Sequence, residues 1–151
     1  DVSHGVAIGD VWIEDRDGRR VDSIGQGDPL VIRAEIEALE HIDDPEVGVT
    51  IHNDEGAVVF GTSTRQLGRE EPAFEPGDRF SVRIALRNDL QPARYYVDCG
   101  VHAGVHRVVA FRWRAGDFLV FGNRPQSGLV ALEHTFDLDR QGKRTEATAA
   151  P

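Results

Sequence analysis

The sequence of 151 residues has one cysteine, no methionine and no long apolar run. A single thiol, Cys99, cannot form an intramolecular disulfide, which excludes the small secreted scaffolds that disulfides hold together. No run approaches the roughly 20 apolar residues of a membrane-spanning helix, and the first residues do not follow the pattern of a signal peptide. We therefore expect a soluble protein from a reducing compartment. The missing initiator methionine leads us to expect a segment cut from a longer protein.

Basic residues are also few. The chain has 17 lysines and arginines against 26 aspartates and glutamates, so its formal net charge is −9. An average surface of this sign repels DNA and anionic lipid headgroups. We expect no nucleic-acid partner.

Apolar and polar residues alternate in several short segments, which is the pattern of strands with one buried face. Residues 29–39 alternate over their whole length, and residues 46–53 and 79–88 repeat the pattern. Asp or Asn and Gly lie between strands in residues 15–20 and 53–57, as tight hairpins require. No segment keeps apolar residues at helical spacing over three turns, so we expect no helix longer than one or two turns.

These segments predict an all-β fold. Strands are expected near residues 5–14, 20–24, 29–39, 46–53, 57–62, 79–88, 93–102, 107–113, 117–121 and 128–138. Many short strands separated by turns are typical of sandwiches and barrels, and we favour an immunoglobulin-like antiparallel β-sandwich of two sheets with about nine strands. We expect one domain over residues 1–140 and a flexible tail over residues 141–151, because the tail has almost no apolar content.

Four segments carry a resemblance to a known family. In order they are "AIGDVWIEDRDGRRVDSIGQGDPLVIRAEIEAL", "PEVGVTIHNDEGAVVFGTST", "YYVDCGVH" and "LVALEHTFDL". The second is the most distinctive, because a "DEG" turn leads into an apolar strand and a small polar "GTST" end. From about residue 5 to residue 138, the chain resembles the C-terminal carbohydrate-binding domain of Wzt-type polysaccharide ABC transporters.

The resemblance implies a module that binds a polysaccharide, usually near its non-reducing end, and does no chemistry on it. Such modules follow the ATPase domain of a subunit that works with a transmembrane subunit to export lipid-linked O-antigen or a related glycan, at the inner face of the cytoplasmic membrane. They often form homodimers by exchanging the terminal strand, which here corresponds to Gly128 to Leu138. No "GxxxxGK[ST]" phosphate loop occurs, so the ATPase itself is not in this chain.

The segment "ARYYVDCGVH" is the strongest candidate for a binding strand. Its alternation predicts that one set faces the core and the other the outside; the core set is Tyr95, Val97, Cys99 and Val101, and the outer set is Tyr96, Asp98, Gly100 and His102. If the strand neighbours residues 46–53, as in immunoglobulin-like sandwiches, Thr50 and His52 lie on the same outer face.

Sugars present C–H faces that stack on aromatic rings and hydroxyls that need donors and acceptors. We therefore predict a glycan site at Tyr96, Asp98, His102, Thr50 and His52. Tyr96 would supply a ring and Asp98 an acceptor, while Gly100 would let a ring approach the backbone. The alternative is that these are ordinary solvent-facing residues of a strand. A different class of function, a protein-interaction or structural sandwich without sugar binding, also stays open.

Other chemistry has weaker support. His102 and His106 are four residues apart, but Gly104 indicates a turn and no ligand set accompanies them, so we predict no metal or other cofactor. No "GxSxG" elbow occurs and Cys99 points to the core, so we predict no enzymatic activity. Trp113, between two arginines, is either a core-capping ring or an exposed stacking platform, and we interpret it as a packing residue.

Overall fold

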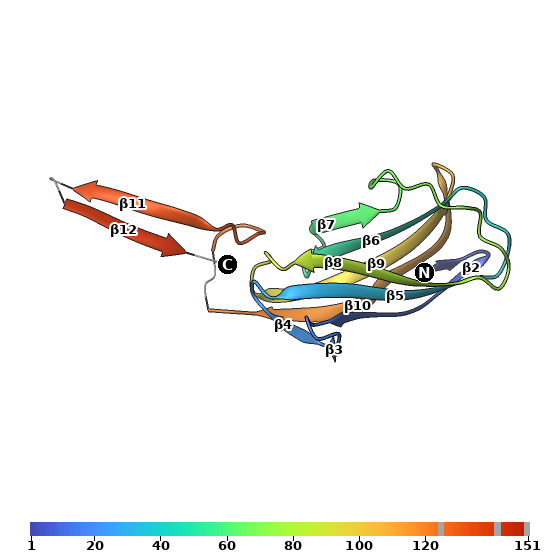
Figure 1. Ribbon diagram of the computed structural model, residues 1–151, viewed down its shortest axis with the longest axis horizontal. Helices are drawn as coiled ribbons and strands as arrows, with labels where there is room; N and C mark the ends of the chain where they lie inside the picture. Colours follow the sequence, from blue (N-terminus) through green and yellow to red (C-terminus); the bar gives the residue numbers. More distant parts are fainter. Residues whose placement is uncertain (124–125, 141–142, 150–151) are drawn as a thin grey trace.

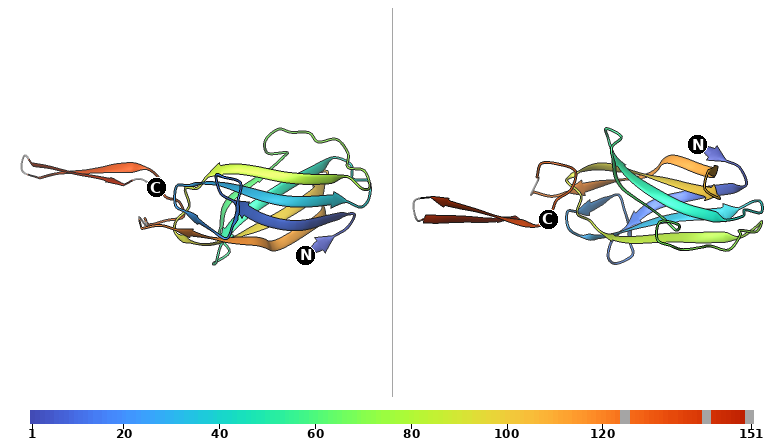
Figure 2. Two further views of the ribbon diagram at one scale, coloured as in Figure 1. Left: turned by 60° about the horizontal axis from the view of Figure 1, so that its bottom comes forward. Right: turned by 90° about the horizontal axis from the view of Figure 1, so that it is seen from above.

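The computed structural model describes residues 1–123, 126–140 and 143–149, with the side chains of residues 1–123 and 126–138. Two sheets pack face to face (Figures 1 and 2). The six-stranded sheet runs β1 (Val2–Ser3), β10 (Arg107–Phe121), β9 (Ala93–Ala103), β6 (Pro45–Asn53), β7 (Val58–Ser63), and β4 (Ser23–Gly25) also pairs with β10. The four-stranded sheet runs β3 (Arg20–Val21), β2 (Val6–Glu14), β5 (Pro29–Ala38), β8 (Arg79–Arg87). The β4–β10 pair is parallel and the other pairs are antiparallel.

The alternating residues form the core between the sheets, as the sequence predicts. In β5, Leu30, Ile32 and Ala34 are fully buried. In β9, Tyr95 is 3% exposed, and its hydroxyl donates a hydrogen bond of 2.7 Å to the carbonyl oxygen of Gln91. The buried side of β9 is therefore the predicted one, and the all-β sandwich is confirmed.

The described ranges contain no helix. They therefore contain no helix that is long and apolar enough to cross a membrane. The predicted hairpin turns are found at Asp15–Arg19 and Asn53–Ala57, where Gly18 and Gly56 have φ of 76° and 82°. Glycine is favoured there because other residues rarely adopt a positive φ.

One side of the sandwich is closed by direct contact between β10 and β2. A Cβ atom on Gly116 would lie 2.8 Å from the carbonyl oxygen of Val11, so only glycine lets the two strands approach this closely. The Arg112 guanidinium donates to the carbonyl oxygens of Ile8 and Gly9 in β2. On the opposite side, between the edge strands β7 and β8, a cavity of about 340 Å³ opens between the sheets.

Strand β10 differs from the prediction of two strands at 107–113 and 117–121. It is one strand of 15 residues, and its pairing with β9 is interrupted between Arg112 and Gly116. At this bulge Arg114 has a φ of 48°, which few residues other than glycine adopt. The bulge lets one strand continue past the irregularity that the sequence pattern suggested was a turn.

The C-terminal part also differs from the prediction. The strand expected over residues 128–138 starts only at β11 (His134–Arg140), which pairs with β12 (Lys143–Ala149) in a hairpin that points away from the sandwich (Figure 1). The expected tail over residues 141–151 thus contains a strand, because polar residues such as Thr145 can pair in a ladder without a core beneath them. The division into one domain over residues 1–140 and a flexible tail stays a prediction.

Candidate functional site

The outer face of the six-stranded sheet brings together residues from β6, β9 and β10. Thr50 lies directly opposite Asp98, and His52 lies directly opposite Tyr96. The neighbouring of these two strands, which was assumed from the fold class, is therefore correct. All four side chains point to the outer face, since the alternate positions fill the core.

Three rings gather on this face. The ring of His52 lies 5.6 Å from that of Tyr96 and 6.2 Å from that of Trp113, centroid to centroid, and it is nearly parallel to the indole, at 8°. Strands β6 and β10 lie on either side of β9, about 9.6 Å apart by ordinary strand spacing. The rings of His52 and Trp113 therefore lean toward each other over β9.

Arg114 completes the group. Its guanidinium carbon lies 4.0 Å from the centre of the Tyr96 ring and 4.4 Å from the centre of the Trp113 ring. Both contacts are close enough for a cation–π interaction. We call His52, Tyr96, Trp113 and Arg114 the ring cluster.

A buried carboxylate holds the ring cluster in place. Asp98 is 8% exposed, and its Oδ1 accepts hydrogen bonds from the backbone N–H of Arg114 at 2.7 Å and from Nε2 of His52 at 3.1 Å. The carboxylate of Asp1 accepts a hydrogen bond of 3.1 Å from the backbone N–H of Trp113. The bulge is thus held by a side chain on each side: Asp98 of β9 and Asp1, the residue before β1.

The members of the ring cluster differ in their exposure. Trp113 is 57% exposed and Arg114 is exposed, whereas Tyr96 is half-buried and His52 is 4% exposed. The indole of Trp113 therefore faces solvent, and the more buried Tyr96, His52 and Asp98 lie beside it. An exposed indole that is held rigidly can stack on the apolar face of a ligand at little entropic cost.

The five predicted site residues are not equally placed. His52 contacts both Tyr96 and Asp98, and Thr50 is half-buried opposite Asp98. His102 is half-buried on the same face but lies opposite Glu46, six residues beyond Tyr96 along β9, which is roughly 20 Å at ordinary strand rise. The structure therefore separates His102 from the ring cluster.

The outer face has no side chains from β6 and β9 at its middle, because two glycines are paired there. Gly48 and Gly100 are directly opposite each other on β6 and β9. A Cβ on Gly100 would lie 3.3 Å from the ring of Phe111, so the ring that approaches this backbone belongs to the protein itself. The floor between the ring cluster and His102 is therefore formed by backbone and the edge of Phe111.

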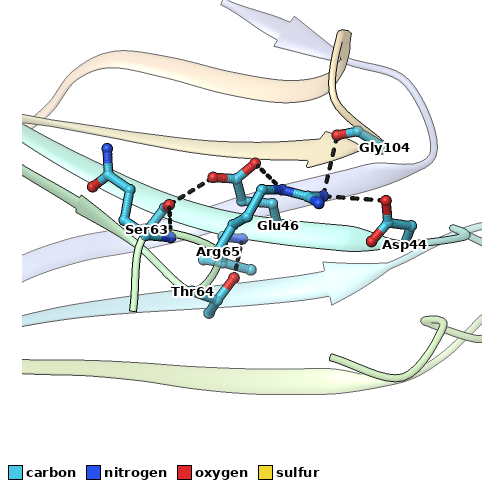
Figure 3. A network of polar contacts seen from close by, with 8 residues as sticks. Asp44, Glu46, Ser63, Thr64, Arg65 and Gly104 are labelled. Carbon is cyan, nitrogen blue, oxygen red and sulfur yellow. Dashed lines mark hydrogen bonds and ion pairs between the residues drawn. The ribbon is translucent and has the colours of Figure 1, made fainter. Parts of the chain in front are cut away.

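A polar network lies at the far end of the face (Figure 3). Arg65 donates from Nε to Glu46 at 3.0 Å and from Nη2 to Asp44 at 3.2 Å and to the carbonyl oxygen of Gly104 at 3.3 Å. The hydroxyl of Ser63, 2.6 Å from Glu46, and the Arg65 guanidinium hold the pKa of that carboxyl below its usual value. Figure 3 shows this arginine tying the segment after β7 to the turn between β9 and β10.

Sequence reasoning missed the two most exposed members of the ring cluster. Trp113 was interpreted as a packing residue, and the structure instead exposes it on the outer face. The available signal was the run "RWRAG", in which a tryptophan between charged residues precedes a glycine that can form a bulge. Period-two alternation fails at a bulge, so it could not assign the side of Trp113 or Arg114.

Metal and thiol chemistry find little support in the geometry. Within the described ranges, no three His, Cys, Asp or Glu side chains are grouped as ligands of a metal ion. Cys99 is fully buried, and burial raises the pKa of its thiol to about 11. A thiol with such a pKa is almost entirely protonated at neutral pH and is a poor nucleophile.

Comparisons with known proteins agree with the fold and the sequence motifs. The model of the Wzt C-terminal domain family matches residues 2–132. The crystal structure of the C-terminal domain of Wzt is similar over 90% of this chain and 85% of that chain, with a TM-score of 0.80 and 20% sequence identity. No curated protein matches the sequence.

Two other solved structures are similar at a lower level, each with a TM-score of 0.47. A β-glucuronidase from glycoside hydrolase family 2 has 15% identity over 68% of this chain and 10% of its own, and the CARDB domain of the PF1109 protein from Pyrococcus furiosus has 13% identity over 80% and 93%. These scores are too low to support a comparison of sites. The family match confirms the resemblance found in the sequence, and the chain belongs to the Wzt C-terminal domain family.

Proposed function

We propose that this chain is a non-catalytic module that binds a polysaccharide on the outer face of its six-stranded sheet. The observation that carries the proposal is the 57% exposed indole of Trp113, which contacts the Arg114 guanidinium and lies nearly parallel to the His52 ring. Family membership supports the same function, because it relates the chain to the substrate-recognition part of an exporter of O-antigen or a related lipid-linked glycan.

The proposed roles follow from exposure. The indole of Trp113 stacks on the C–H face of a sugar ring, and Arg114, Tyr96 and Thr50 bond its oxygen atoms. His52 and Asp98 are too buried to be the main contacts, so they position the bulge. His102 lies further along the face and would reach a neighbouring sugar of the same polymer.

The test compares the two tryptophans of the chain. Trp113 belongs to the ring cluster, whereas Trp12 lies on the outer face of the opposite sheet, flanked by Arg20 and Arg33. In titrations with a panel of bacterial surface polysaccharides, Trp113→Ala should weaken binding at least about tenfold, which is about 1.4 kcal/mol. Trp12→Ala should leave the affinity unchanged.

The titration also distinguishes the alternative function. A chain that captures no glycan of any class, but binds a protein through the same aromatic face, would be a protein-interaction sandwich. Equal losses in the Trp113→Ala and Trp12→Ala variants would place the glycan elsewhere.

We infer that two copies of the chain associate through the C-terminal hairpin, as a homodimer that exchanges its last strands. Strand β11 and the residues before it expose a row of apolar side chains, namely Leu132, Phe136 and Leu138, at 63%, 64% and 49%. A hairpin of two strands has little stability in water by itself, so a second copy is a natural cover for this row. Pairing would raise the avidity for a polymer without new contacts to sugar.

Sedimentation of the wild-type chain and of a Phe136→Ser, Leu138→Ser variant tests the dimer. The wild type should sediment as a dimer at micromolar concentration, and the variant as a folded monomer. A monomeric wild type would contradict the exchange while leaving glycan binding intact.

In the parent transporter, we place this module on the cytoplasmic side of the membrane, after the ATPase domain and beside the transmembrane subunit. The support is the family relation. Affinity purification of the parent subunit should recover the transmembrane subunit from detergent extracts, and its absence would contradict the placement.

A further inference from the structure

Three carboxylates around the ring cluster are hydrogen-bonded within the protein. Asp98, its buried carboxylate, already accepts two hydrogen bonds from the cluster itself. Asp117, which lies opposite Tyr96 on β10, accepts a hydrogen bond of 2.6 Å from Arg94. Asp1 accepts from the amide of Trp113. Each of these three carboxylates therefore accepts at least one hydrogen bond within the protein.

The Arg114 guanidinium is the opposite case. It is exposed, its contacts are the faces of two rings, and among the residues that the structure describes it has neither a hydrogen-bond acceptor nor an ion-pair partner. Arg65, Arg87 and Arg94, by contrast, each bind a carboxylate. The rings hold the plane of the Arg114 guanidinium and leave its N–H edges open.

A guanidinium has five N–H donors and no acceptor. A sugar hydroxyl can take one of these donors, but a carboxylate or phosphate can take two in parallel, with the stronger bonds that a charged acceptor makes. Because the Arg114 guanidinium has no acceptor among the described residues, the group that best matches its open N–H edges is an anion attached to a sugar ring.

We propose that the ring cluster selects a sugar that carries an acidic group, with the sugar ring on Trp113 and the acid on Arg114. This inference rests on the proposed glycan-binding function. The net charge of −9 is compatible with it, because repulsion by distant charges is screened beyond about 10 Å at 0.1 M salt, whereas the contact with Arg114 is direct.

The experiment uses matched pairs of small sugars and follows the indole N–H signal of Trp113 by NMR. Methyl glucuronide is compared with methyl glucoside, and glucose 6-phosphate with glucose; the galacto and manno forms of each pair cover the unknown stereochemistry. The acidic member should bind at least about tenfold more tightly in at least one pair. Whether the uronate or the phosphate is preferred identifies the anion.

Arg114→Gln should abolish the preference for the acidic sugar while the weak shift with the neutral sugar remains. Glutamine faces the same positive φ as arginine, so the bulge is no more strained, and a well-dispersed spectrum would verify the fold. Arg83→Gln is the control, since this exposed arginine lies on β8 in the opposite sheet, and it should keep the preference.

The outcomes separate this inference from the function on which it rests. Neutral sugars that shift the Trp113 signal as strongly as acidic ones, or a preference that survives Arg114→Gln, overturn the acid selectivity and leave glycan binding standing. If neither small sugars nor the polysaccharides titrated against Trp113→Ala bind, both proposals fail.

Discussion

Asp98 shows how one buried side chain organises an exposed surface. Its carboxylate is 8% exposed, yet it bonds the backbone of Arg114 and the ring of His52, which lie on different strands. A carboxylate that accepts hydrogen bonds at this depth is costly to remove, because its donors are left without partners. The position of the exposed indole thus depends on a residue that a ligand hardly touches.

Replacement of Asp98 by alanine should therefore destabilise the fold as well as the site. We expect a loss of about 1–3 kcal/mol in the free energy of unfolding, since two N–H donors lose their acceptor. Urea unfolding followed by tryptophan fluorescence measures it. Asp117→Ala should have a much smaller effect, because its pair with Arg94 is exposed. Equal effects of the two substitutions would contradict the role assigned to Asp98.

A second prediction concerns His41, which lies between two carboxylates. Its Nδ1 is 2.9 Å from Glu75 and its Nε2 is 2.9 Å from Asp43. The hydrogen bond to Glu75, and to a smaller extent the one to Asp43, raises the pKa of the imidazole above 6.5. A raised pKa in the folded state means that the protonated ring stabilises the fold below pH 6.5. This contribution is lost as the pH rises through the folded-state pKa.

The urea midpoint of His41→Gln should accordingly fall below that of the wild type at pH 5.5, and the difference should shrink at pH 8.5. His106→Gln serves as the control, because within the described ranges the structure shows no carboxylate bonded to it. If the difference in urea midpoint instead grows from pH 5.5 to pH 8.5, the protonated ring does not stabilise the fold through its contact with Glu75.

At the scale of the element, β10 carries most of the architecture that matters for the site. Its first half pairs with β1, its second half with β4, and the bulge between them bears Trp113 and Arg114. Immediately after the bulge, Gly116 lies against the backbone of β2. The bulge therefore serves both the exposed platform and the closed side of the sandwich.

Gly116→Ala should be strongly destabilising. The added Cβ would lie 2.8 Å from the carbonyl oxygen of Val11, so β2 or β10 must move, and overpacking of this kind costs about 1–3 kcal/mol. Gly61→Ala is the matched control in β7, because its nearest neighbour would be the hydroxyl of Thr50 at an ordinary 3.7 Å. Urea unfolding of both variants decides the matter, and a tolerated Gly116→Ala would show that the strands are not in contact.

Element by element, alternation was a sound guide wherever a strand is regular. It assigned Tyr95 to the core and Tyr96 to the outside, and together with the strand order assumed from the fold class it put Thr50 and His52 on the face of Asp98. It failed at Trp113, because an extra residue in a bulge reverses the side of those that follow, and this reversal depends on contacts with β2 that are distant in sequence. The burial of His52 was likewise beyond reach, since the rings beside it, those of Tyr96 and Trp113, come from two other strands.

At the scale of the whole molecule, the sandwich and the hairpin are separable parts. The segment before the hairpin packs on the sandwich. Ala131 is fully buried, and its N–H donates a hydrogen bond of 2.7 Å to the backbone carbonyl oxygen of Asp89. The side-chain amide of Gln91 donates to the carbonyl oxygen of Val130. From His134 onward, the chain pairs within the hairpin and extends away (Figure 2). We therefore expect the boundary of the stable unit near residue 133.

A chain that ends at residue 133 should unfold cooperatively with the same urea midpoint as the full chain at concentrations where the full chain is monomeric. A chain that ends at residue 122 should unfold at a lower midpoint, because it lacks Ala131 and the bonds around it. Circular dichroism measures both. Equal midpoints for the two truncations would mean that residues 123–133 do not stabilise the sandwich.

The bond between Asp1 and the amide of Trp113 has a practical consequence for anyone who labels or immobilises this protein. A sensor chip or affinity handle attached at the first residue can pull on Asp1, whose carboxylate accepts the hydrogen bond from the Trp113 amide. The attachment would then disturb the face on which we propose that the glycan binds. Attachment through the distal hairpin keeps that surface under no mechanical strain.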